Sequence, residues 1–230
     1  MNKTKNLDLR KVCGIAVFSA LAFVVALVCN VIPPIAGFLS LDVKDAVIAI
    51  ASFIYGPISA VLISFIAAFI EFMTFSTTGW YGFVMNFVSS AVFSLVASFI
   101  YRKFRSINGA LVAFFAAIIA TTGVMLLLNI FVTPIYLFDY LKVMPEAAAR
   151  EYVMSILPTI LLPFNASKAL LNSSVAMLLY KPLTVAFAKA KLVQGKATKL
   201  TFNKYSIVII VVGTITLAAA IVSFVIINNA

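Results

Sequence analysis

The sequence predicts an all-α integral membrane protein. Of its 230 residues, 64% are hydrophobic and only 10% are charged. Several stretches run for about 18 positions or more without a charged side chain, which is long enough for a helix to cross the bilayer core. A soluble fold cannot bury that much apolar surface, and no hydrophilic segment is long enough for a separate globular domain. We therefore expect one helical bundle whose function lies within or beside the membrane.

Seven apolar stretches indicate the spans of this bundle. We expect helices at about 12–32, 43–55, 57–75, 81–101, 107–131, 152–180 and 206–227. The first stretch is too long for the apolar core of a typical signal peptide and lacks a cleavage site, so it is predicted to be retained. The domains that follow are an N-terminus at 1–11, a six-helix membrane domain at 12–182, a basic linker at 183–205 and an additional transmembrane helix at 206–227.

The second and third spans are ambiguous by apolarity alone. From Asp45 to Phe75 only Gly56-Pro57 and Glu71 interrupt the run, which permits one long helix or two short helices joined by a tight turn. Two helices place most of the 17 basic residues on the side of the N-terminus, whereas one helix moves the cluster at 102–105 to the other side. The positive-inside tendency therefore favours two helices, a cytoplasmic N-terminus and an extracellular C-terminus.

The same assignment defines the two faces of the bundle. Five carboxylates, Asp42, Asp45, Asp139, Glu146 and Glu151, are expected on the outer side, together with substantial loops at about 33–42 and 132–151. Because the basic residues lie in short loops beside apolar spans, the net charge of +10 indicates orientation, and no nucleic-acid partner is expected.

Several kinds of catalytic chemistry are missing from the sequence. There is no histidine, no Walker-type phosphate loop and no nucleophile elbow. Cys13 and Cys29 lie 16 positions apart on one predicted helix, which excludes a mutual disulfide and a paired-cysteine metal site. We expect no catalytic residue, no cofactor and no metal. If such a chain binds a molecule in the membrane, it must rely on an ion gradient or on the energy of a partner.

Lys168 is the most informative polar residue, because an ammonium group inside a span costs at least a few kcal/mol without partners. Asn165, Lys168 and Asn172 follow at i, i+3 and i+7, so they share one helix face and form a polar stripe. The alternative is that Lys168 reaches the outer interface or pairs with Glu71. Asn129 is a second candidate binding residue, because its amide offers both donors and acceptors to a ligand rich in hydroxyl groups.

Other polar and small residues have a structural explanation. Asn86, Ser89 and Ser90 are interpreted as packing contacts between helices and are left out of the site. Ala16, Ala20, Ala22 and Ala26 form two overlapping small-xxx-small pairs, which suit either internal packing or the docking of a separate membrane subunit. Trp80, Tyr81 and Phe83 indicate an interface belt, with closure of a pocket over a flat ring as the alternative.

A set of short motifs makes a family resemblance visible. In chain order they are Leu41-Asp42-Val43-Lys44-Asp45-Ala46, Phe53-Ile54-Tyr55-Gly56-Pro57, Ser76-Thr77-Thr78-Gly79, Met85-Asn86 and Leu162-Pro163-Phe164-Asn165-xx-Lys168. Over about residues 10–185 the chain resembles the substrate-binding S components of energy-coupling factor (ECF) vitamin transporters, most closely the riboflavin-specific type. The riboflavin assignment depends mainly on Pro163-Phe164-Asn165-xx-Lys168 and Asn129.

The resemblance implies a function and a set of partners. Such a subunit binds its vitamin from outside, docks on a transmembrane scaffold subunit with two cytoplasmic ATPases, and topples in the bacterial cell membrane to deliver it. The expected ligand is riboflavin, with FMN and FAD left open. Substrate-binding residues are then expected at Asn129, Asn165 and Lys168, with Leu41, Asp42 and Glu71 completing the site. The four alanines of the first helix match the family's docking motif, and the first outer loop would close over the ring.

One feature departs from the family pattern, and several rivals remain. The seventh stretch is interpreted either as an added anchor or as a helix that modulates docking, with Gln194-Gly195 keeping its linker flexible. The nearest rival function is an S component for pantothenate, folate or a cobalamin relative. A membrane-embedded enzyme and a stand-alone secondary carrier are the rivals from other classes.

Overall fold

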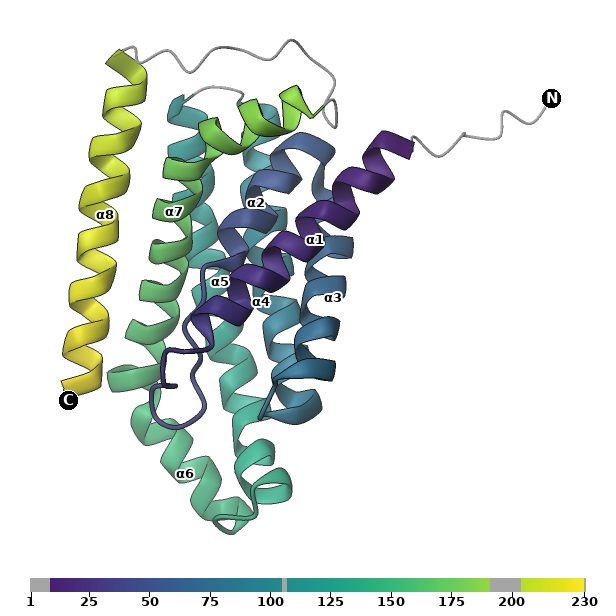
Figure 1. Cartoon of the computed structure of the whole chain (residues 1–230). Helices are drawn as coiled ribbons and strands as arrows, with labels where there is room; N and C mark the ends of the chain where they lie inside the picture. Colours follow the sequence, from purple (N-terminus) through teal and green to yellow (C-terminus); the bar gives the residue numbers. More distant parts are fainter. Residues whose placement is uncertain (1–8, 105–106, 191–203, 230) are drawn as a thin grey trace.

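The computed structural model describes residues 9–104, 107–190 and 204–229, and these residues form a helical bundle without a β-strand (Figure 1). In chain order the helices are α1 (Leu9–Cys29), α2 (Lys44–Tyr55), α3 (Pro57–Thr74), α4 (Gly79–Lys103), α5 (Ile107–Ile135), α6 (Glu146–Ile156), α7 (Leu162–Lys189) and α8 (Lys204–Asn229). Two π-helical turns, η1 (Tyr136–Tyr140) and η2 (Leu157–Leu161), extend α5 and join α6 to α7. The predicted all-α class is confirmed.

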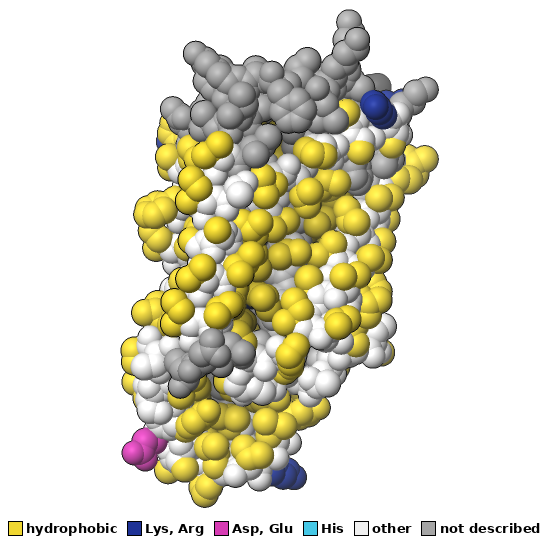
Figure 2. Space-filling model, turned by 60° about the vertical axis from the view of Figure 1, so that its left-hand side comes forward, with side chains coloured by type: hydrophobic (Ala, Val, Ile, Leu, Met, Phe, Trp, Pro, Cys, Tyr) yellow, Lys and Arg dark blue, Asp and Glu magenta, His cyan; other side chains and the backbone are white. Residues whose placement is uncertain are grey.

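Five helical segments are long and apolar enough to cross a membrane within the described residues. They are Leu9–Cys29, Pro57–Thr74, Gly79–Lys103, Gly109–Tyr140 and Glu146–Tyr180. Figure 2 shows hydrophobic side chains over the middle of the face on the α8 side, with charged side chains only near the two ends. A multi-pass membrane protein presents this distribution because lipid tails surround its middle and water surrounds its ends. The protein is therefore a multi-pass membrane protein.

The break between the second and third spans lies at Gly56, as predicted. Gly56 has φ +96°, a conformation that side chains disfavour, and it ends α2 while Pro57 begins α3. However, α2 has only 12 residues. At 1.5 Å per residue it spans about 18 Å, little more than half of a bilayer core. The expected second span is thus a short helix, and residues 30–43 form the irregular segment before it.

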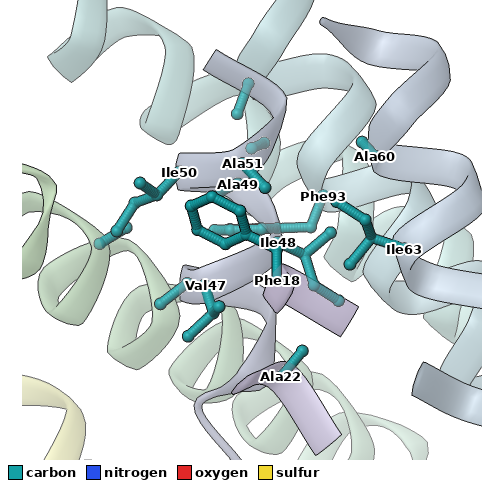
Figure 3. Close-up of a cluster of buried hydrophobic side chains, with 14 of the residues drawn as sticks. Phe18, Ala22, Val47, Ile48, Ala49, Ile50, Ala51, Ala60, Ile63 and Phe93 are labelled. Carbon is teal, nitrogen blue, oxygen red and sulfur yellow. The ribbon is translucent and has the colours of Figure 1, made fainter. Parts of the chain in front are cut away.

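The core lies around α2, whose sequence is apolar on all sides after its first turn. Phe18, Ile48 and Phe93 are fully buried there, with alanines between them (Figure 3). All residues of α2 from Lys44 to Ser52 are buried. A helix that is buried all round must be enclosed by its neighbours, and contacts with α1, α3, α4 and α7 enclose α2. This enclosed helix fixes where the segment before it enters the bundle.

The second outer loop is much shorter than expected. Helix α5 with η1 continues to Tyr140, and α6 begins at Glu146. Most of the stretch 132–151 is therefore helical, which corrects the expectation of an outer loop. Arg150 donates to Glu146 over 2.7 Å in an i, i+4 pair that supports the first turns of α6.

The additional helix α8 packs along α7 and completes one side of the bundle (Figure 1). Ser174 of α7 donates to the hydroxyl of Thr216 over 2.6 Å, and Ala220 is fully buried. Helix α7 continues to Lys189, so the first part of the expected linker at 183–205 is helical. Residues 191–203, including Gln194-Gly195, lie outside the described residues.

Candidate functional site

A cavity opens among the loop before α2, the beginning of α4, the end of α5 with η1, and the beginning of α7. It contains about 670 Å³ of space not filled by atoms, part of it open to solvent. Its lining residues are Phe38, Leu39, Ser40, Thr78, Tyr81, Gly82, Met85, Asn86, Ser89, Met125, Asn129, Val132, Thr133, Tyr136, Phe164, Asn165 and Lys168. Four separate segments of the chain thus converge on one site.

One part of the wall is aromatic. The ring of Tyr136 lies 6.2 Å from that of Phe38 and 5.9 Å from that of Tyr81, measured between ring centroids. Tyr81 is held in turn by a hydrogen bond of 2.9 Å from its hydroxyl to Asp139, and Trp80 stacks on it at 4.1 Å. Such a wall offers flat, rigid contact area to a ring system at low conformational cost.

Another part of the wall is polar and comes from α5 and α7. The amide of Asn165 donates to the carbonyl of Leu161 over 2.7 Å, and the amide of Asn129 donates to Met125 over 2.7 Å. Thr133 donates to the side-chain oxygen of Asn129 over 2.8 Å. Since an amide has two N–H donors and two acceptor lone pairs, these bonds orient both side chains and leave hydrogen-bonding capacity for a ligand.

Lys168 completes the polar wall and belongs to a buried charge cluster, which we define as Asp42, Lys44, Glu71 and Lys168. The Lys168 ammonium lies 2.8 Å from a carboxylate oxygen of Asp42 and also donates to the carbonyl of Ser40 over 3.1 Å. The Lys44 ammonium lies 2.8 Å from Glu71 and 3.6 Å from Asp42. Each ammonium group is thereby compensated, as a charge buried at this depth requires.

The charge cluster is anchored to α2 by neutral partners. Asn172 accepts from the backbone N–H of Ala46 over 2.9 Å and donates to the carbonyl of Asp42 over 2.9 Å. The hydroxyl of Ser90 donates to Asp45. The two bonds of Asn172 satisfy backbone groups at the start of α2, where a helix has unpaired N–H groups. They also fix the segment that carries Ser40 against α7.

The structure brings together only part of the predicted site. Asn129, Asn165 and Lys168 line the cavity, whereas Leu41, Asp42 and Glu71 line a neighbouring hollow that shares Ser40, Thr78 and Asn86 with it. The expectation that Asp42 and Asp45 belong to an outer acidic surface was wrong, because they are only 5% and 3% exposed. The alternative in which Lys168 pairs with Glu71 is not observed: Lys168 pairs with Asp42, and Lys44 pairs with Glu71.

Sequence reasoning missed several wall residues. Asn86 and Ser89, which were interpreted as packing, lie on the cavity wall, and the Asn86 amide donates to Glu71 over 3.4 Å. The signal was present in their spacing, because Gly82, Asn86 and Ser89 follow at i, i+4 and i+7 on one face of α4. Tyr81, expected at the membrane interface, is 4% exposed and lies on the wall.

The four alanines of α1 divide into two groups. Ala22 and Ala26 are buried, at 0% and 4% exposed, and they pack inside the chain. Ala16 and Ala20 are exposed on the surface of α1. Of the four alanines, only Ala16 and Ala20 are therefore accessible to another membrane subunit.

Comparison with known proteins relates this geometry to a family. The family model "ECF transporter, substrate-specific component" matches residues 10–180. Curated relatives include the riboflavin transporter RibU of Staphylococcus aureus, 29% identical over 80% of this chain and 96% of its own length. The riboflavin transporter FmnP of Bacillus subtilis is 25% identical over 76% of this chain and 92% of its own length.

A solved structure, described as the S component of a bacterial ECF transporter, has a similar fold. It matches with a TM-score of 0.63 and 28% sequence identity, over 80% of this chain and 99% of the other. The matched family range covers α1 to α7 up to residue 180 and ends before α8. The chain therefore belongs to the ECF transporter family as a substrate-specific S component, which is a membrane transport subunit and not an enzyme.

Proposed function

We propose that this S component captures riboflavin from the outer side of the membrane. The observation that carries the proposal is the composition of the cavity wall, where Phe38, Tyr81 and Tyr136 adjoin the polar groups of Asn165 and Lys168. A flavin combines a flat tricyclic ring with a hydroxylated side chain, so its two parts match the two parts of this wall. The named activity of the RibU and FmnP relatives supports the same ligand.

The cavity is proposed to face outward, with the N-terminus of the chain in the cytoplasm. The beginning of α1, the α2–α3 turn and the end of α7 lie at one end of the bundle (Figure 1). The guanidinium of Arg102 is close to Gly56 at that same end. Basic residues gather on the cytoplasmic side of membrane proteins. The cavity is built from the opposite ends of α4, α5 and α7, which then face outside, and α8 directs the C-terminus outside as well.

Delivery is proposed to follow docking on an ECF transmembrane scaffold subunit that carries two cytoplasmic ATPases. Ala16 and Ala20 are the exposed small pair on α1, and small residues allow two helices to approach closely in a membrane. Toppling of the loaded subunit within the bilayer would then bring the cavity to the inner side. Leu41, Asp42 and Glu71 are proposed to shape the site from the adjoining hollow.

Riboflavin binding is tested directly by fluorescence. The purified protein should quench added riboflavin, and the flavin should be detectable by absorbance if it copurifies. Lys168→Ala and Asn165→Ala should each weaken binding by about 1–3 kcal/mol, because each removes a hydrogen-bonding group from a buried site. Lys142→Ala is the matched control, since Lys142 is exposed and lies outside the cavity.

The outcomes separate the proposal from its rivals. Wild-type protein that neither contains flavin nor quenches riboflavin would exclude this ligand, and a screen of pantothenate, folate and cobalamin relatives would then identify another vitamin. Unchanged affinity in both variants would remove Lys168 and Asn165 from the site. Uptake that persists without the ATPases and collapses with the ion gradient would indicate a secondary carrier.

A further inference from the structure

Helix α8 lies outside the matched family range, yet its contacts lead to the cavity. The face of α8 that packs on α7 carries Gly213, Thr216, Ala220 and Phe224, at spacings of three or four residues. This is the spacing of one helix face. Residues outside this stripe, such as Val225 and Ile226, are 54% and 62% exposed. One stripe of α8 is therefore buried against the bundle, while the rest of the helix is available to lipid.

The last buried residue of this stripe contacts a residue of the cavity wall. Phe224 is 8% exposed, and its ring packs edge-to-face on Phe164, with centroids 5.8 Å apart and planes at 75°. Phe164 is 3% exposed and lines the cavity. It thus lies between α8 and the ligand space. An edge-to-face pair of this kind is specific in geometry, so it restricts where the Phe164 ring can lie.

The position of Phe164 in turn affects the polar wall. Phe164 directly precedes Asn165, one turn before Lys168, and it follows η2 and Pro163. A π-helical turn and a proline both reduce the regular hydrogen bonding of a helix, so this part of α7 depends more on side-chain packing than a regular helix does. Support for the Phe164 ring from α8 therefore also supports the neighbouring amide of Asn165.

We infer that α8 is part of the binding unit, and that Phe224 is a positioning residue that holds Phe164 and the adjoining wall of α7 in the geometry that receives the ligand. This role differs from that of a membrane anchor, since an anchor needs only an apolar surface. It also implies that α8 moves with the bundle when the subunit reorients. Of the two measurements below, only the binding assay rests on riboflavin being the ligand.

The test compares variants of the full chain in detergent, with riboflavin as the probe. Phe224→Ala should raise the dissociation constant for riboflavin about two- to tenfold, the range expected from losing one aromatic pair. Phe224→Leu retains most of the volume without the ring edge and should give a smaller loss. Ile226→Ala changes the lipid-facing side, and Thr216→Val removes the hydroxyl contact to Ser174, about 15 Å along α7 from Phe164. Both controls should bind riboflavin as the wild type does.

Hydrogen–deuterium exchange of ligand-free protein is the second measurement. Phe224→Ala should increase exchange in residues 161–168, whereas Thr216→Val should leave this segment unchanged. The inference is overturned if Phe224→Ala leaves both affinity and exchange unchanged, or if Thr216→Val alters them to the same degree. Should Phe224→Ala fail to fold, unchanged exchange and affinity in Phe224→Leu would overturn it. Wild-type protein that does not bind riboflavin would refute the proposed ligand, and the exchange comparison would still decide the role of Phe224.

Discussion

Replacing Asp42 by asparagine tests the charge cluster beside the cavity. The substitution keeps the size of the side chain and removes its charge. In the wild type one Asp42 oxygen lies 2.8 Å from the Lys168 ammonium and 3.6 Å from that of Lys44. The side chains of Asp42 and Lys168 are 7% and 11% exposed, so water can replace the lost partner only in part. Asparagine can still accept one hydrogen bond, but it cannot compensate an ammonium charge.

The size of the effect follows from burial. Removing one partner of a buried ion pair costs about 3–5 kcal/mol, and the remaining hydrogen bond places this variant near 3 kcal/mol. For a chain of this length, that corresponds to a melting temperature lower by roughly 6–12 °C. The pair of Glu146 and Arg150 has a similar separation of 2.7 Å but is more than half exposed. Such a surface pair contributes about 0.2–1 kcal/mol, so Glu146→Gln should have a much smaller effect.

Thermal unfolding in one detergent, followed by far-UV circular dichroism, measures both variants under the same conditions. The double variant Asp42→Asn/Lys168→Met removes both charges of the pair and should regain part of the stability that Asp42→Asn loses. The reasoning is refuted if Asp42→Asn is no less stable than Glu146→Gln. It is also refuted if the loss of stability in the double variant equals the sum of the losses in Asp42→Asn and Lys168→Met, because two residues that interact directly should not give additive effects.

Further predictions concern the helices. Ala20→Leu should leave riboflavin binding intact and reduce association with the scaffold subunit in a pull-down; equal docking by Ala20→Leu and wild type would remove this face from the interface. Ala22→Leu, at a fully buried position, should reduce the free energy of unfolding by about 1–3 kcal/mol through overpacking and so lower the melting temperature. Gly56→Ala should destabilise the α2–α3 turn by about 1 kcal/mol or more, because φ is +96°, a conformation that side chains disfavour; an unchanged melting temperature would contradict this.

The fold was largely predictable because its main determinants are local. A membrane helix needs an apolar stretch of sufficient length, and that can be counted along the chain. The turn at Gly56 was predictable from Gly-Pro and from the distribution of basic residues, and the inward stripe of α7 from helical spacing. The stretch 132–151 was less predictable. Its charged residues indicate a loop in a hydropathy scan, yet Asp139 lies in η1 and Glu146, Arg150 and Glu151 lie in α6.

The pairing of charges was not predictable, because it depends on which helices meet. Lys44 directly follows the first predicted loop in sequence, yet it is buried and pairs with Glu71 of α3, which is 27 positions away along the chain. Asp42 and Lys168 are 126 positions apart. No periodicity within one helix relates such partners. The contact of α8 with Phe164 was missed for the same reason, since an apolar helix gives no indication of which neighbour it will pack on.

The short length of α2 explains why the charge cluster exists. Because α2 covers only part of the bilayer, the irregular segment at 30–43 continues into the bundle, and its last residues, 41–43, are buried or half-buried. Backbone groups at that depth need partners within the protein. Side chains of α7 supply the missing partners: Lys168 donates to the carbonyl of Ser40, and Asn172 bonds with Asp42 and Ala46. These bonds fix to α7 the segment whose Phe38, Leu39 and Ser40 line the cavity. Lys168 therefore lines the cavity and also holds this segment against α7 through Ser40. A ligand group that hydrogen-bonds to the Lys168 ammonium would compete with or strengthen that contact.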